Sequence, residues 1–275
     1  MLENIHILYL SILQGITEFL PVSSSGHLVL LSKFTNFPDQ GLVLDVAVHF
    51  GSILAVLMYF SSTIADMIKG VWKSRFIPNT ANESAKLFWL LVVGTLPIVV
   101  AGLLLRNYGT EWMRSTKLIG WTILGYGLLL LFADSCSMTV RQIKHMGFLD
   151  AILIGLAQCL ALIPGTSRSG ITITMARFLG LERTEAAKFS MLLSIPAIIG
   201  ATSLVCWKII ADGDFAEIAQ VFDGVVYSYA ASIVAIYIVM WWLKKSTFFP
   251  FVIYRVALGT FLLLDSYGYL HKWLD

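Results

Sequence analysis

Six long apolar runs constrain the fold of this chain more than any other feature of its sequence. Each is long enough to cross about 30 Å of hydrocarbon as a helix. They cover residues 41–60, 87–105, 117–133, 186–206, 225–243 and 251–268. The composition agrees, with 57% hydrophobic and 13% charged residues, whereas soluble domains have roughly 45–50% and 25%. Because hydrocarbon offers the backbone no water, the sequence predicts an all-α integral membrane protein, with residues 1–275 in a single membrane domain.

Two further apolar segments are interrupted by proline and glycine. The first covers 5–33 and breaks at Pro21, and the second covers 148–180 and breaks at Pro164. Each half is shorter than the ~20 residues that a full crossing needs, so we expect two re-entrant helix hairpins beside the six spans. Irregular backbone at membrane depth is tolerated only where it is buried in protein or lines a wet cavity. The two breaks therefore predict a cavity.

The two halves of the chain follow one plan, a re-entrant hairpin and then three spans. The first half covers residues 1–133 and the second 148–268. An offset of 144 residues (158 − 14) places Gln158 on Gln14 and Ser167 on Ser23. Since each half crosses the membrane an odd number of times, the second is inverted relative to the first. We therefore predict inverted-topology repeats whose broken helices meet near the midplane.

Basic residues are spread between the spans and indicate the topology. The polar loop 61–86 is rich in them and is expected on the cytoplasmic side, which places both termini outside. A net charge of +2 is too small to favour nucleic acid as a partner. Bilayer lipids are the expected surroundings. The oligomeric state stays open, with a homodimer among the alternatives.

Two polar residues interrupt the first apolar segment before its break. Gln14 and Glu18 are four residues apart, so on a helix they share one face. A hard divalent cation with oxygen ligands, Mg²⁺ or Ca²⁺, would satisfy both side chains. A buried glutamate paired with an internal basic residue explains the same pattern, and both interpretations stay open here.

Hydroxyls and an imidazole follow the first break, in the order Ser23, Ser24, Ser25, Gly26, His27. A hydroxyl beside an imidazole suits a base-activated nucleophile, or a histidine that itself attacks phosphorus. Helix capping explains one of the serines, and an interior histidine is the structural alternative for His27. We favour a catalytic role.

Four other polar or charged residues are weaker candidates for the site. Asp45 and His49 stand one helical turn apart at the head of a span and could line the cavity. Arg177 and Arg255 fit helix-end or interfacial charges about as well as any site role.

The second break carries an anion-binding pattern. It comprises Gly165, Thr166, Ser167, Arg168, Ser169 and Gly170. Backbone N–H groups at a helix start, hydroxyls and a guanidinium together suit phosphate. Arg168 could instead pair with Glu18, and it could do both in turn, resting on the carboxylate in the empty site and binding phosphate in the filled one.

These motifs resemble the undecaprenyl pyrophosphate phosphatases of the bacitracin-resistance family. The likeness rests on Gln14–His27 and Pro164–Gly170 and covers nearly the whole chain. It extends through three further stretches, Asp45–Gly51, Glu185–Pro196 and Pro250–Arg255.

The resemblance implies an enzyme of the bacterial inner (plasma) membrane whose site opens toward the periplasm. It would hydrolyse undecaprenyl diphosphate to undecaprenyl phosphate, recycle the lipid carrier of cell-wall synthesis and confer bacitracin resistance. It makes Glu18 and Gln14 the metal-associated motif, Ser24 and His27 the nucleophile or base, and Arg168 the pyrophosphate-binding arginine. The first motif position is Glu or Gln in the family. Here it is Gln14, which weakens any clamp of two carboxylates on the metal.

The substrate-binding residues that we predict are Arg168, Ser167, Ser169, Thr166, Gly165, Gly170, Ser23 and Ser25. The polyprenyl tail is expected along a lipid-facing groove between spans. A polyprenyl-phosphate transporter or flippase is the alternative function, since inverted repeats with broken helices are also a transporter plan.

Overall fold

The computed structural model describes residues 2–24, 26–28, 31, 41–78, 82–105, 113, 115–136, 140–212 and 218–269. In the first half the long elements are α1 (Leu2–Thr17), α3 (Gly41–Tyr59), α4 (Ser61–Lys73), α5 (Glu83–Leu105) and α6 (Thr116–Cys136). In the second half they are α7 (Phe148–Cys159), α8 (Arg168–Phe178), α9 (Arg183–Asp212), α10 (Ile218–Leu243) and α11 (Phe249–Ser266). Two short 3-10 turns, Ile143–His145 and Leu160–Leu162, and one isolated bridge between Arg141 and Leu181 also occur. The predicted all-α class is confirmed for the described residues.

Five of these helices are long and apolar enough to cross a membrane. They are α5, α6, residues Arg183–Ser203 of α9, residues Val221–Leu243 of α10, and α11. A sixth span results if Val43–Tyr59 and Ser61–Lys73 are counted as one, although the two meet at a bend of 77°. The expected multi-pass membrane protein agrees with these lengths and compositions.

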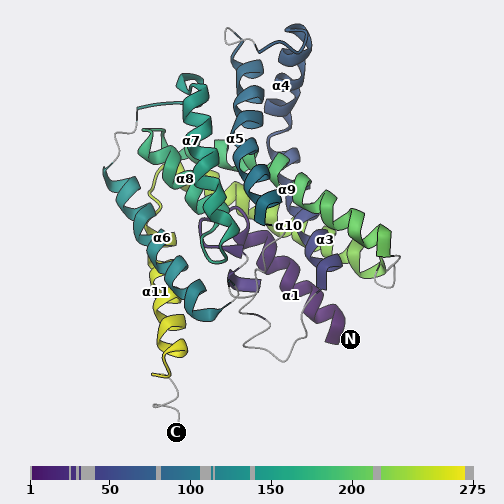
Figure 1. The fold of residues 1–275 in the computed structure, drawn as a ribbon, viewed down its shortest axis with the longest axis vertical. Helices are drawn as coiled ribbons and strands as arrows, with labels where there is room; N and C mark the ends of the chain where they lie inside the picture. Colours follow the sequence, from purple (N-terminus) through teal and green to yellow (C-terminus); the bar gives the residue numbers. More distant parts are fainter. Residues whose placement is uncertain are drawn as a thin grey trace.

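One expectation about the connections is wrong. The sequence predicts a polar loop over 61–86, but the first part of this segment forms α4. This helix is amphipathic: Met67, Gly70 and Val71 are buried, while Lys69 and Lys73 are exposed. The buried side lies against α5 (Figure 1). The apolar positions recur at helical spacing between the charged residues of this segment, which is the pattern of an amphipathic surface helix.

The long helices pack in pairs drawn from the two halves of the chain. α3 lies against α10 and α9, and α6 runs beside α11 (Figure 1). The short helix α1 packs on α10, and the short helix α7 packs on α5. Glycine permits both close approaches, because a Cβ at Gly15 would lie 2.6 Å from the Ser228 carbonyl oxygen, and one at Gly155 would lie 2.3 Å from that of Gly94. Each short helix is therefore seated on a long helix of the other half.

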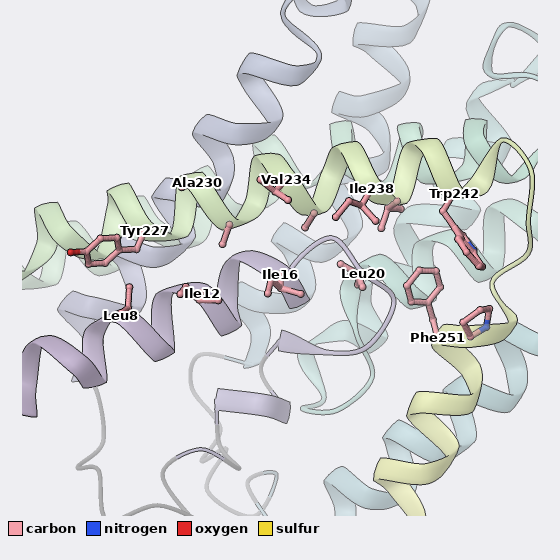
Figure 2. A pocket seen from close by; sticks show the side chains of 14 residues that line it. Leu8, Ile12, Ile16, Leu20, Tyr227, Ala230, Val234, Ile238, Trp242 and Phe251 are labelled. Atoms are coloured by element: carbon pink, nitrogen blue, oxygen red, sulfur yellow. The ribbon is translucent and has the colours of Figure 1, made fainter.

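An apolar groove of about 620 Å³ follows the contact between α1 and α10. Leu8, Ile12 and Ile16 of α1 face α10, as Figure 2 shows. Trp242 and Phe251 stand at one end, near the start of α11. Leu20, just past α1, also lines the groove and stands two residues beyond Glu18. The groove is thus one lipid-compatible surface close to the first break.

Candidate active site

The two breaks have the same backbone geometry at the positions that the offset of 144 residues pairs. Ser23 has φ of 77° and Ser167 has φ of 72°, values that are uncommon for a residue with a Cβ. Each serine hydroxyl accepts a hydrogen bond from the N–H of the glycine three residues on, Gly26 at 3.3 Å and Gly170 at 3.1 Å. In the second segment this makes Ser167 the N-cap of α8. The internal correspondence seen in the sequence therefore extends to local structure.

Glu18 is the centre at which the two breaks meet. Its Oε2 accepts hydrogen bonds from Gln14 Nε2 at 2.8 Å and from the Ser24 hydroxyl at 2.7 Å. Its Oε1 accepts one from Arg168 Nη2 at 2.6 Å, across 150 residues of sequence. The side chains of Glu18 and Arg168 are only 6% and 16% exposed. The alternative in which Arg168 pairs with Glu18 is confirmed, and so is the contact between the two broken segments.

A cavity of about 340 Å³ opens on this pair. Its polar part is formed by Glu18, Ser24, Ser167 and Arg168, joined by Asp45 and His49 of α3. Its other wall is largely apolar and is contributed mainly by α5 and α9, through Ile98, Ala197, Ile198 and Ala201. The predicted cavity at the breaks is confirmed. Charged groups beside an apolar wall suit a ligand with an anionic head and a hydrocarbon tail.

His49 is the histidine that reaches this centre. Its Nδ1 lies 2.7 Å from the carbonyl oxygen of Asp45, so that nitrogen carries the proton. Its Nε2 lies 3.9 Å from Glu18 Oε2, the oxygen that also holds Ser24. In the neutral ring Nε2 is therefore a base within the cavity. The only sequence signal for His49 is its spacing of one helical turn from Asp45, which is weak evidence for a site residue.

The structure does not bring His27 together with these residues. The side chain is buried, with Nδ1 2.6 Å from the carbonyl oxygen of Ser23 and Nε2 bonded to the Tyr254 hydroxyl. The two rings also stack, with centroids 5.5 Å apart. Among the described residues His27 does not line the cavity. Its catalytic role stays a prediction, and its observed contacts support the first break.

The remaining predicted residues surround the Glu18–Arg168 pair or support it. The Ser169 hydroxyl donates to the Leu20 carbonyl at 2.9 Å and so joins the two segments. Thr166 is buried, and its hydroxyl has no partner in the described part of the chain. Gly165 has φ of 88°, and a Cβ there would lie 2.2 Å from the Thr122 hydroxyl, so only glycine fits. Ser25 lies outside the described residues.

The oxygen atoms around Glu18 fit a hard divalent cation. Gln14 Oε1 is buried and has no hydrogen-bond partner among the described residues. Glu18 lies beside it, and Asp45 lines the same cavity. Carboxylate and amide oxygens are the ligands that Mg²⁺ and Ca²⁺ prefer. No cluster of three or more His, Cys, Asp or Glu suited to a metal occurs in the described ranges, so an ion here would rely on the amide oxygen and on the substrate.

Arg255 contacts both breaks, a position that the sequence does not predict. It belongs to α11, is fully buried, and donates to backbone carbonyls of both breaks and of α6. A signal was present, because a charged residue inside an apolar membrane segment is costly and usually functional. Its position near the start of the 251–268 run also fits a helix-end charge.

Known proteins similar in sequence to this chain show its family. The family model of the bacitracin resistance protein BacA matches residues 7–261. The chain is 47% identical to undecaprenyl-diphosphatase 1 of Rhodospirillum rubrum, over 96% of this chain and 95% of that protein. It is 45% identical to the undecaprenyl-diphosphatase of Roseobacter denitrificans, over 96% and 98% of the two chains. A match over most of the chain and identities well above 30% show the family. The chain belongs to the bacitracin resistance protein BacA family.

Proposed function

We propose that this chain hydrolyses undecaprenyl diphosphate to undecaprenyl phosphate and inorganic phosphate. It would thereby recycle the lipid carrier of cell-wall synthesis and confer resistance to bacitracin. The observation that carries the proposal is the Glu18 carboxylate, which holds the Ser24 hydroxyl at 2.7 Å and the Arg168 guanidinium at 2.6 Å in one cavity. The choice of undecaprenyl diphosphate as the substrate rests on the names of the relatives, which are called undecaprenyl-diphosphatase.

Arg168 binds the diphosphate in this scheme. Its Nη1 is buried without a partner among the described residues, while Nη2 is held by Glu18. A phosphate oxygen therefore completes the guanidinium, and the Thr166 hydroxyl, also without a partner in the described ranges, offers a further donor. The Arg168 guanidinium stabilises the negative charge on the phosphoryl group while that group is transferred from the diphosphate.

Ser24 is the nucleophile in this scheme. Its hydroxyl passes its proton to Glu18 while Oγ attacks the terminal phosphorus, and the bond to the bridging oxygen breaks to release undecaprenyl phosphate. Water then attacks the phosphoserine, with His49 Nε2 placed to take a proton from it. The phosphorus–Oγ bond breaks, Glu18 returns its proton to Ser24 Oγ, and inorganic phosphate leaves.

A divalent cation would be held by Glu18, Gln14 Oε1 and Asp45. When bound, it would neutralise part of the charge on the diphosphate. The residues of the chain then keep the roles given above.

The membrane arrangement that we propose has six spans, with α3 and α4 counted as one. The two re-entrant hairpins of an inverted repeat would be residues 5–33 and 148–180. The matching conformations of Ser23 and Ser167, and the seating of α1 and α7 on helices of the opposite half, support it. The protein would lie in the inner membrane with the cavity open to the periplasm. A homodimer is compatible with this arrangement.

Phosphate release in detergent tests the function. Purified protein given undecaprenyl diphosphate is expected to release inorganic phosphate, to stop on chelation with EDTA, and to recover when Mg²⁺ or Ca²⁺ is returned. Detergent micelles hold no gradient, so a transporter or flippase would release none. Movement of the lipid across vesicles by a protein that frees no phosphate would favour that alternative.

The prenyl tail is proposed to leave along the α5 and α9 wall, because that wall shares a cavity with Glu18 and Arg168. Ala201→Trp on this wall is expected to raise KM for the C55 substrate about tenfold, since one bulky ring displaces about two prenyl carbons at ~0.8 kcal/mol each. The KM for a C15 diphosphate should change less. The measurement is steady-state phosphate release with both substrates.

The matched control for this prediction is Ala230→Trp, which adds the same side chain to the exposed groove between α1 and α10. Its KM for either substrate should stay near the wild-type value. If Ala230→Trp raises KM for the C55 substrate and Ala201→Trp does not, the tail lies in the groove of Figure 2 instead.

A further inference from the structure

Arg255 makes an unusual set of contacts for a buried cation. Its guanidinium donates only to backbone carbonyl oxygens, and no carboxylate pairs with it in the described part of the chain. The five acceptors are the carbonyls of Ile123 (3.0 Å), Thr122 (3.3 Å), Pro21 (3.2 Å), Gly165 (3.2 Å) and Thr166 (3.1 Å). Three of these five belong to the two breaks. One side chain from α11 thus fixes backbone in both halves of the site.

The bond to Thr166 determines the direction of the next amide. In a trans peptide the C=O and N–H point to opposite sides, and the described residues contain no cis peptide. Because the Thr166 carbonyl points at Arg255, the N–H of Ser167 points away from it. Ser167 and Arg168 line the cavity, whereas Arg255 does not. Ser167 thus lines the cavity with its N–H turned away from Arg255.

This amide is available to a ligand. Among the described residues it donates to no acceptor, in contrast to the Thr166 N–H, which bonds to the Ile163 carbonyl. The positive φ of Ser167 is a conformation that residues with a Cβ keep only when their surroundings hold them there. The Arg255 bonds to the two carbonyls just before Ser167 provide that hold.

We propose that Arg255 is a positioning residue for the reaction: it holds the Thr166–Ser167 peptide so that the Ser167 N–H donates to a phosphoryl oxygen in the transition state. This rests on the proposed phosphatase function. The amide complements Arg168, which supplies charge, with a fixed dipole that needs no reorganisation. Arg255 itself touches no substrate.

The test compares Arg255→Lys with the wild type. A lysine keeps the charge but lacks the planar fork that spans several carbonyls. Loss of one pre-organised donor lowers kcat by about 100-fold in comparable sites. We expect that loss with KM changed less than about threefold, since the donor acts in the transition state. Affinity for vanadate, which mimics the transferring phosphoryl group, should fall in parallel, while inorganic pyrophosphate should bind nearly as before.

Arg177→Lys is the matched control. Arg177 is also fully buried, but it bonds to Asp134 and to the Leu181 carbonyl at the far end of α8. This variant should lose thermal stability and keep kcat and vanadate affinity once folded. If Arg255→Lys behaves in the same way, Arg255 only stabilises the fold and the proposal is wrong.

A second measurement covers variants that fail to fold. In wild-type protein labelled with ¹⁵N-serine, the Ser167 amide, identified by its absence in Ser167→Ala, should shift downfield when vanadate binds. An unmoved Ser167 signal at saturating vanadate contradicts the proposal even if the enzyme is active. Wild-type protein that releases no phosphate contradicts the proposed function, and the inference falls with it.

Discussion

Replacing Ser24 with alanine is expected to lower kcat for phosphate release from undecaprenyl diphosphate at least ~10³-fold, which is the scale of removing a nucleophile. The Ser24 hydroxyl is bonded to Glu18 at 2.7 Å, so the variant loses the attacking oxygen and leaves the carboxylate its bonds from Gln14 and Arg168. Substrate binding should change little, because Arg168 remains. Steady-state kinetics together with equilibrium binding of inorganic pyrophosphate measure the two effects.

The control for this prediction is Ser11→Ala in α1. Ser11 is buried, whereas Ser24 is half-buried. The Ser11 hydroxyl has no partner among the described residues, and Ser11 does not line the cavity. It should keep near-normal turnover.

The chemical identity of the intermediate gives a sharper test of the same role. Substrate labelled with ³²P on its terminal phosphate should leave an acid-stable phosphoserine at Ser24, most abundant in His49→Asn because hydrolysis of the ester is then slow. An acid-labile label would place the phosphoryl group on a histidine and would contradict the serine mechanism. His27→Asn should still form the labelled ester, since His27 contacts Ser23 and Tyr254 rather than the cavity.

The centre of the site was predictable from the sequence because its members are polar residues at two breaks in apolar segments. Glu18 and Arg168 are expensive in a membrane unless they pair or bind a ligand. The internal correspondence placed the two breaks face to face, and the observed bond of 2.6 Å between their side chains agrees.

The choice between histidines was not predictable, because adjacency in sequence is not adjacency in space. His27 follows the serines directly in sequence. The chain turns at Ser23, which has a positive φ, and the His27 ring is bonded to the Tyr254 hydroxyl. His49 comes from α3 and reaches Glu18 only through the packing of that helix. No local pattern encodes such a long-range contact.

Helix α4 and Arg255 were missed for a different reason. Both carried usable signals, an amphipathic period in one and a charge inside an apolar run in the other. The bend between α3 and α4 and the direction of the carbonyls around Arg255 depend on tertiary packing, which no local sequence pattern specifies. For example, the five carbonyls that surround Arg255 come from three separate segments.

The pair of Glu18 and Arg168 can be separated into structural and catalytic parts by a double-mutant cycle. Arg168→Met leaves a carboxylate only 6% exposed without its cation, and Glu18→Leu leaves the guanidinium without its anion. Removing one partner of a buried pair costs about 3–5 kcal/mol, whereas replacing both with apolar residues is often close to neutral. Each single variant should therefore unfold at a lower temperature in detergent than the double variant.

Activity should not follow stability in this cycle. Arg168→Met is expected to lower kcat/KM by ~10³ to 10⁵-fold, the range found for arginines that stabilise phosphoryl transfer. The double variant should be as inactive as the singles although it regains stability, because it lacks both the proton acceptor of Ser24 and the phosphate-binding cation. Near-normal turnover in Arg168→Met would contradict the phosphate-binding role. Losses of stability that simply add in the double variant would contradict a direct pair. If the double variant recovers stability but not turnover, apolar residues at positions 18 and 168 serve the fold as well as the ion pair does. The role of the pair is then in the reaction and not in stability.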